Sequence, residues 1–152
     1  MSKSLRLILF CSVACIFIAC DSETLYSGSV SLPLSGWHAD SALNFNFAVS
    51  DTISPCNVII SVRHTNNYPY QNMWLIVDNS LQNRVDTIEF YLADQRGVWL
   101  GSGNSRLREM PILFLENYQF ADTAMQHISI RHAMRDTLLR GVSDIGVRIE
   151  RR

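Results

Sequence analysis

The chain has 152 residues, of which 47% are hydrophobic and 18% are charged, and its formal net charge is -1 at pH 7. This length is enough for one domain with a substantial core and too short for two domains of ordinary size. The balanced charge gives no electrostatic basis for binding nucleic acid, or for a basic patch that attracts a membrane surface, so neither is expected.

The first 19 residues have the pattern of an export signal. Lys3 and Arg6 precede an uncharged apolar run over 7–18, which is too short to remain as a membrane-spanning helix. The run ends at Phe17-Ile18-Ala19-Cys20, which resembles a bacterial lipobox, where the cysteine is diacylated and becomes the new amino terminus. The sequence therefore predicts a signal peptide over 1–19 and lipidation of Cys20. An ordinary signal peptide that leaves a plain thiol at Cys20 is the alternative.

Lipidation at this cysteine would hold the domain at a membrane. Each buried methylene contributes about 0.8 kcal/mol, and two acyl chains anchor stably where one does not. Cys11 and Cys15 lie inside the signal peptide, so Cys56 is the one cysteine left unmodified and no intrachain disulfide is expected. The hydrophobic core must then stabilise the exported domain, with Cys56 as a small buried hydrophobe.

Residues 20–36 are predicted to carry the lipid and to form a tether or an edge segment beside the domain. The stretch 21–36 is rich in serine and contains two glycines and one proline, a composition typical of linkers. The globular domain is therefore expected over residues 37–152.

Short strands fill this domain. Apolar and polar residues alternate over 43–50, 57–63 and 144–150, which is the period of half-buried strands. The run Met73–Val77 is apolar at every position and predicts a strand covered on both faces. Further strands are expected near 88–92, 112–115 and 128–130, with turn residues between them.

The regular spacing of these strands predicts an all-β fold, an antiparallel β-sandwich of jelly-roll type. One short helical stretch is expected over 133–140, with Gly141 ending it.

No residue pattern points to catalysis. The histidines have neither the spacing of a helical zinc motif nor cysteine partners, the acidic residues occur singly, and no nucleophile elbow is present. The sequence therefore predicts no catalytic residue, no metal and no cofactor, and the chain is not expected to be an enzyme.

Aromatic residues are the candidates for contact with a sugar or a partner protein. Tyr68 and Tyr70 flank Pro69 in a loop and are predicted to form an exposed pair. Trp37 and Trp99 are further candidates, with core packing as the alternative. Trp74, inside an apolar run, is expected in the core.

Several short motifs follow one another along the mature chain: Gly36-Trp37-His38, Asn66 to Tyr70, Gly97 to Gly101, and Gly141 to Glu150. Together with the lipobox, this order resembles the GldH family of gliding motility lipoproteins. The resemblance implies a cell-envelope lipoprotein of Bacteroidota, anchored in the outer membrane, that is an accessory or assembly component of motility or secretion machinery. It implies other envelope proteins of that machinery as partners, and of the family's residues only the acylated cysteine transfers, onto Cys20.

Two functions follow. The first is a non-enzymatic accessory lipoprotein whose sandwich docks on other envelope proteins. The alternative is a membrane-tethered carbohydrate-binding module. They differ in what the exposed aromatic side chains contact.

Overall fold

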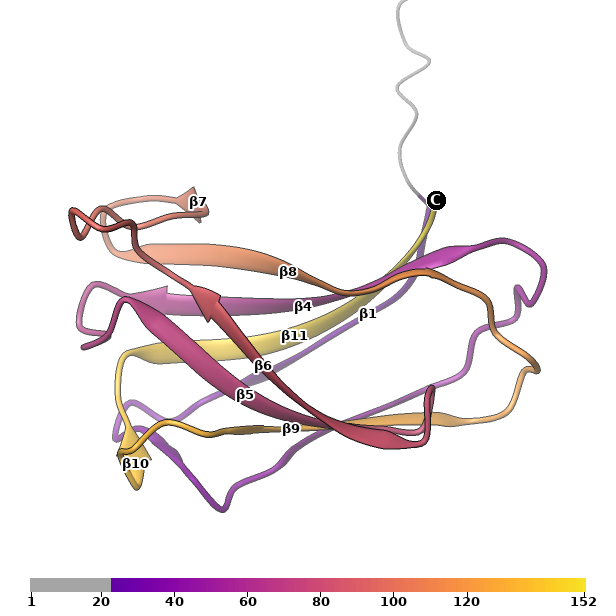
Figure 1. Cartoon of the computed structure of the whole chain (residues 1–152), viewed down its shortest axis with the longest axis horizontal. Helices are drawn as coiled ribbons and strands as arrows, with labels where there is room; N and C mark the ends of the chain where they lie inside the picture. The colour runs from indigo at the N-terminus through magenta and orange to yellow at the C-terminus, as the bar shows by residue number, and fades with distance from the viewer. Residues whose placement is uncertain (1–22) are drawn as a thin grey trace, which may run out of the picture.

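The structure is a computed structural model that describes residues 23–152; Cys20 and the predicted signal peptide lie outside the described residues. Two antiparallel sheets lie face to face with the hydrophobic core between them (Figure 1). The predicted all-β antiparallel sandwich is therefore confirmed. From residue 23 to the end, no helix is long and apolar enough to cross a membrane.

The first sheet has five strands in the order β1, β11, β4, β8 and β7, with the bounds Thr24–Ser31, Val142–Arg151, Cys56–Thr65, Leu107–Tyr118 and Ser102–Gly103. The second sheet has four strands in the order β3, β9, β5 and β6, with the bounds Leu43–Phe47, Gln126–His132, Asn72–Asn79 and Arg84–Tyr91. Two short strands, β2 (Trp37–His38) and β10 (Leu138–Leu139), pair with each other.

Alternation of side chains places one apolar face of the main strands in the core. In β4, Val58, Ile60 and Val62 are fully buried, whereas the residues between them are half-buried. In β3, three buried apolar residues alternate with two exposed asparagines. Because successive side chains of a strand point to opposite faces, this period buries one face of each sheet against the other.

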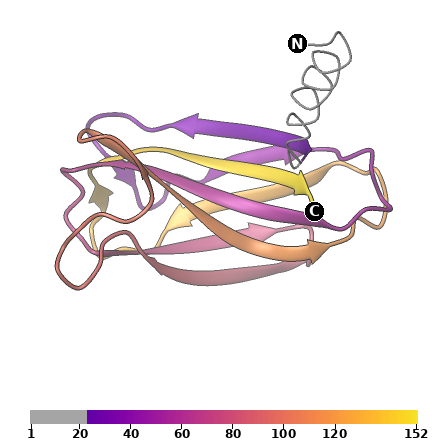
Figure 2. The same cartoon turned by 90° about the horizontal axis from the view of Figure 1, so that it is seen from above.

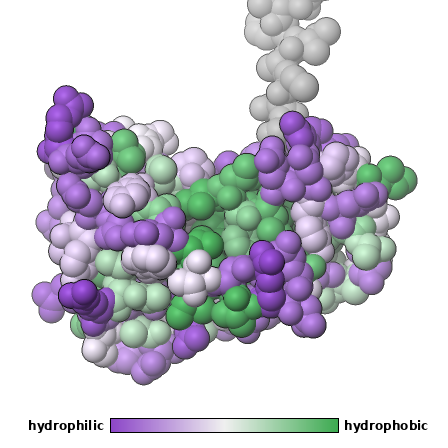
Figure 3. Space-filling model, viewed as in Figure 1, coloured by the Kyte–Doolittle hydropathy of each residue, from purple (hydrophilic) through white to green (hydrophobic). Residues whose placement is uncertain are grey.

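The two long sides of the sandwich differ. On one side β1 lies beside β3, where the rings of Tyr26 and Phe47 stack with their centroids 4.7 Å apart. On the other side β8 and β6 leave the edge open, and Figure 3 shows a hydrophobic surface there. Partly buried side chains such as Ile112 and Phe90 belong to these strands, so the core is less well covered on this side.

Loops form both ends of the sandwich. Strands β1, β4, β6 and β9 begin, and β3, β5, β8 and β11 finish, at the end where the C-terminus lies (Figure 2). We call this the terminal end; its loops are 48–55, 80–83 and 119–125. The opposite end, with the loops 32–36, 66–71, 92–101 and 133–141, is the distal end.

The sandwich extends to Thr24 instead of starting near residue 37, which corrects the expected boundary. Residues 24–31 form the edge strand β1, which pairs with β11. Of the two predictions for this stretch, a tether or an edge segment, the structure shows the edge segment. The serines that suggested a linker alternate with partly buried residues such as Tyr26 and Val30, which pack against the core. Composition concealed this strand because serine occupies its outer positions.

Residues 133–140 form no helix, which corrects the expected helical turns. The chain bends after β9 and then pairs as β10 with β2, and the N–H of Ala39 donates to the carbonyl oxygen of Thr137 at 2.8 Å. Leu139 is fully buried by this pairing. Extended structure is favoured because it satisfies the hydrogen-bonding groups of the backbone and buries Leu139. Together these two gains outweigh a weak local preference for helix.

Only one face of β5 is covered, although its apolar run predicts cover on both. Met73, Leu75 and Val77 are fully buried, whereas Trp74 is 37% exposed and Ile76 is half-buried on the outer face. The prediction that Trp74 lies in the core is therefore wrong, and β5 presents an indole ring to solvent.

Two buried histidines are expected to make the fold sensitive to acid. His64 and His132 are 0% and 3% exposed, and each donates one ring hydrogen bond, to the carbonyl oxygens of Thr65 (3.1 Å) and Trp37 (3.0 Å). The other ring nitrogen of each has no partner among residues 23–152. Burial lowers the pKa of both rings below the ordinary value of 6.5, because protonation would place an unpaired N–H in the core.

Below pH 6.5 the unfolded state therefore binds more protons than the folded state. The free energy of unfolding should be highest above that pH and fall as the pH drops, by up to about 1.4 kcal/mol per pH unit for each histidine. Urea unfolding at several pH values measures this slope. The double variant His64→Gln/His132→Gln should flatten it, and His38→Gln, at an exposed position, should not. An equally steep slope in the double variant would contradict the assignment.

Candidate functional site

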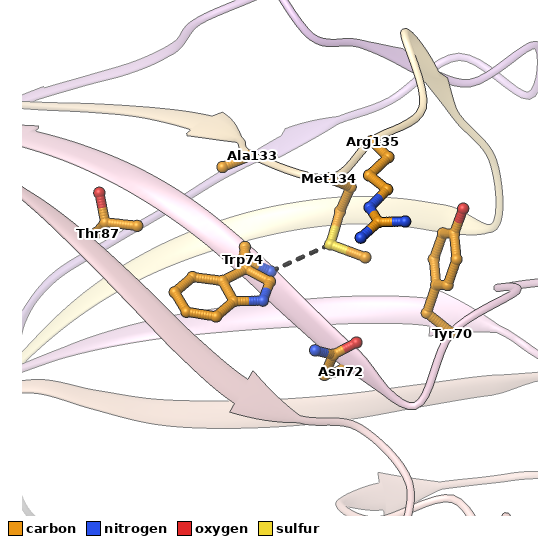
Figure 4. A pocket seen from close by; sticks show the side chains of 7 residues that line it. All are labelled: Tyr70, Asn72, Trp74, Thr87, Ala133, Met134 and Arg135. Atoms are coloured by element: carbon orange, nitrogen blue, oxygen red, sulfur yellow. Dashed lines mark hydrogen bonds between the residues drawn. The ribbon is translucent and has the colours of Figure 1, made fainter.

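A hollow of about 630 Å³ opens on the outer face of the second sheet, toward the distal end. Its lining comes from the loop before β5, from β5 and β6, and from the segment after β9 (Figure 4); the residues are Tyr70, Asn72, Trp74, Thr87, Ala133, Met134 and Arg135. We call it the Trp74 hollow.

Backbone contacts hold the segment after β9 against β5. The carbonyl oxygen of Trp74 accepts from the N–H of Ala133 at 2.8 Å, and the N–H of Trp74 donates to the thioether sulfur of Met134 at 3.3 Å. Figure 4 shows the Met134 side chain between Trp74 and Tyr70. A thioether is a weak acceptor on a flexible side chain, so this wall of the hollow is apolar and adaptable.

Polar groups surround this apolar surface in fixed positions. The Tyr70 hydroxyl donates to Oδ2 of Asp136 at 3.0 Å, and this hydrogen bond raises the pKa of Tyr70, which stays protonated. The amide of Asn72 donates to Oε1 of Glu89 at 2.6 Å. Arg135 forms no ion pair with any residue from 23 to 152, so its charge remains available to a bound partner.

Of the two tyrosines predicted to form an exposed pair, one lines the hollow and the other is buried. Tyr70 lies in the hollow, as expected for a contact residue. Tyr68 is 3% exposed, its hydroxyl donates to the carbonyl oxygen of Asn72 at 2.8 Å, and burial raises its pKa. The expectation of exposure is wrong for Tyr68, because its ring packs into the core behind Tyr70, with the ring centroids 6.0 Å apart.

The two tryptophans named as candidates lie outside the hollow. Trp37 is 1% exposed, and its Nε1 donates to the carbonyl oxygen of Ser41 at 2.8 Å, so it is a core residue. Trp99 is half-buried, with its ring centroid 4.7 Å from that of His64. Neither is brought together with Tyr70 in the hollow. Cys20 lies outside the described residues, so its lipidation remains a prediction.

Sequence reasoning missed Trp74 and Met134. A signal for Trp74 was present, because Asn72 and Asp78 share its phase of the two-residue period and are polar, which indicates an outer face. Met134 gave no such signal, since its place beside β5 depends on how the chain leaves β9.

Another hollow, of about 220 Å³, lies on the outer face of the first sheet over Gly146. Charged side chains in its lining form an ion pair, since Nε of Arg63 lies 2.6 Å from Oδ1 of Asp144. Within the described part of the chain, no three histidine, cysteine or acidic side chains are grouped so that they could hold a metal ion. The Trp74 hollow is therefore the better candidate for binding.

A model of the GldH lipoprotein family matches residues 24–149. A gliding motility lipoprotein GldH homolog of Christiangramia forsetii is 30% identical over 161 residues, which cover 99% of this chain and 98% of that protein. The gliding motility lipoprotein GldH of Flavobacterium johnsoniae is 30% identical over 149 residues, which cover 91% and 92% of the two chains. Among solved structures, dimeric latent PorU from Porphyromonas gingivalis overlaps 88% of this chain and 14% of its own, at 13% identity and a TM-score of 0.31.

Proposed function

The chain belongs to the GldH family of gliding motility lipoproteins, and we propose that it is a non-enzymatic accessory or assembly component of motility or secretion machinery. Family membership makes it a lipid-anchored protein of the cell envelope. The proposal places the anchor on Cys20 and in the outer membrane. Its partners are other envelope proteins of the same machinery, which it contacts through the exposed sandwich.

The observation that carries this proposal is the composition of the Trp74 hollow. Trp, Tyr and Arg are the residues most enriched at the hot spots of protein interfaces, and Met adapts to varied surfaces. Trp74, Tyr70, Arg135 and Met134 meet in this one hollow (Figure 4). It fits a partner that lays an apolar side chain over the indole and presents a carboxylate to Arg135.

Photocrosslinking from the rim of the hollow tests the proposal. Benzoylphenylalanine in place of Thr87, which lines the hollow from β6, is expected to crosslink in living cells to an envelope component of the machinery. Adding Trp74→Ala should reduce this crosslink at least tenfold, because truncating a hot-spot residue costs about 2 kcal/mol or more. Leu113→Ala, at an exposed site on the other sheet, is the control and should change nothing. An undiminished crosslink with Trp74→Ala would count against the proposal.

The alternative, a membrane-tethered carbohydrate-binding module, is favoured by one feature of the same hollow. Asn72 and Glu89 are held together by their 2.6 Å hydrogen bond, and Glu89 is the cross-strand partner of Trp74. An aromatic face flanked by an amide and a carboxylate suits a sugar ring, which has an apolar face and hydroxyl groups at its rim. Glycan binding that is lost in Tyr70→Ala, together with no crosslinked protein, would favour this alternative.

A further inference from the structure

We infer that the terminal end of the sandwich rests on the lipid headgroup layer and that Ile53 and Met125 insert into it. The inference rests on the proposed anchor at Cys20. It concerns a surface remote from the Trp74 hollow, formed by the loops 48–55 and 119–125.

Very little chain separates the proposed anchor from the folded domain. β1 begins at Thr24, and Glu23 before it is already held, because its carbonyl oxygen accepts from the N–H of Arg151 at 2.9 Å. Cys20 and Glu23 are three Cα steps apart, which span at most about 11 Å in a fully extended chain. The headgroup layer is itself roughly 5–7 Å thick, so Glu23 can lie no more than about 6 Å beyond the bilayer surface, and loops at the same end are within reach of the headgroups.

The loop that carries Ile53 is fastened beside the start of β1. The side chain of Arg151 pairs with Glu23 and also with Asp51, the latter at 2.7 Å. Oδ1 of Asp51 accepts from the N–H groups of Ser54 and Ile53, at 2.9 Å each, and these bonds lower the pKa of the carboxyl. The loop is therefore a fixed turn that holds the Ile53 side chain, 83% exposed, out in solvent.

Met125 projects from the neighbouring loop at the same end. Its side chain is 69% exposed, directly before β9. Gln119, near the start of this loop, donates from Nε2 to the carbonyl oxygen of Ile53 at 3.1 Å, which links the two loops. Hydrophobic atoms protrude at the right-hand edge of Figure 3, where these loops lie in Figure 1. Two apolar side chains thus project from the end at which the anchored chain enters.

The charges at this end nearly cancel. Its loops and chain ends carry the acidic side chains of Glu23, Asp51 and Asp122 and the basic side chains of Arg151 and Arg152. Arg151 pairs with the first two of these acids. Among the described residues 23–152, this end has no basic cluster to attract anionic lipid, so contact with the membrane depends on insertion of the apolar side chains.

Insertion of these side chains gives a modest gain in free energy, and the entropy cost that opposes it is small. Moving an exposed Ile or Met side chain from water into an apolar layer is favourable. The anchor already holds the domain at the surface, so insertion does not have to overcome the entropy of bringing protein and membrane together. In this orientation the strands rise up to about 25–40 Å from the bilayer. The Trp74 hollow, on a sheet face toward the distal end, then lies clear of the lipid.

Fluorescent labels at three exposed positions test the orientation in phosphatidylethanolamine vesicles that carry the full acylated chain. Ile53→Cys and Met125→Cys report on the terminal end, and Leu34→Cys, at the distal end, is the control; the native Cys56 is buried and does not compete for label. Each label is a bimane, and the vesicles are prepared with and without a doxyl-labelled lipid as quencher. We expect at least twofold quenching at positions 53 and 125 and none at 34.

Flotation of the same vesicles separates failure of this inference from failure of the anchor. Protein that floats but shows equal quenching at all three positions would overturn the membrane contact and leave the Cys20 anchor intact. Protein that does not float would overturn both. A further variant, Ile53→Asp, keeps the anchor and should lower quenching at position 125, because a buried carboxylate opposes insertion. Unchanged quenching in this variant would remove Ile53 from the contact.

Discussion

Replacing Trp37 by alanine is expected to lower the free energy of unfolding by about 3–5 kcal/mol. Trp37 is 1% exposed, its Nε1 donates to the carbonyl oxygen of Ser41 at 2.8 Å, and its ring meets that of His132 edge-on at 5.1 Å. Alanine would leave a cavity and remove this hydrogen bond. Because Cys56 is a free cysteine, no disulfide among residues 23–152 limits the loss, which is a large part of the 5–15 kcal/mol typical of a domain.

Trp74→Ala is the matched control for this measurement. The same side chain is removed, but Trp74 is 37% exposed, so urea unfolding should show a loss of less than about 1–2 kcal/mol. The two variants therefore distinguish a residue needed for stability from a residue needed for binding. Trp37→Ala should lower the free energy of unfolding, and Trp74→Ala should remain folded but lose the crosslink to the partner. Equal destabilisation by the two substitutions would contradict the assignment of Trp37 to the core and Trp74 to the surface.

Cys20→Ala is expected to abolish membrane anchoring. Stable attachment takes two acyl chains, each contributing about 0.8 kcal/mol per buried methylene, and removing the acylated sulfur removes both. Two exposed apolar side chains at the terminal end cannot replace them. The variant should move from the detergent phase to the aqueous phase in phase-partition assays of cell extracts, and it should not float with vesicles.

Cys56→Ala is the control for this experiment, because it removes the other mature thiol while leaving the anchor in place. Cys56 is fully buried, so the substitution changes core packing but not the surface. It should partition into detergent as the native chain does. Cys20→Ala protein that is exported, processed and still detergent-soluble would contradict the proposed anchor.

Alternation of side chains was enough to predict the sandwich. The positions Leu43, Phe45 and Phe47 are buried in β3 as their spacing indicates, and β4 follows the same rule over a longer stretch. In β11 the predicted apolar positions are buried, but Asp144 and Gly146 in the other phase are buried as well. This works because the period of two is a property of the extended backbone itself and needs no knowledge of which strand lies next to which. The lipobox is likewise a linear motif, and its prediction at Cys20 does not depend on the fold.

The exposure of each aromatic side chain was decided by partners remote in the chain. Trp37 is covered because β2 pairs with β10, and Trp74 is uncovered because it points to the outer face of β5, which is open. The same pairing of β2 with β10 overrode the local helix preference of 133–140.

The Trp74 hollow exists only after folding, since Tyr70, Thr87 and Met134 come from three separate segments. Backbone periodicity is local and can be read from neighbouring residues. Burial is a property of contacts between distant segments, and so it appears only in the tertiary structure.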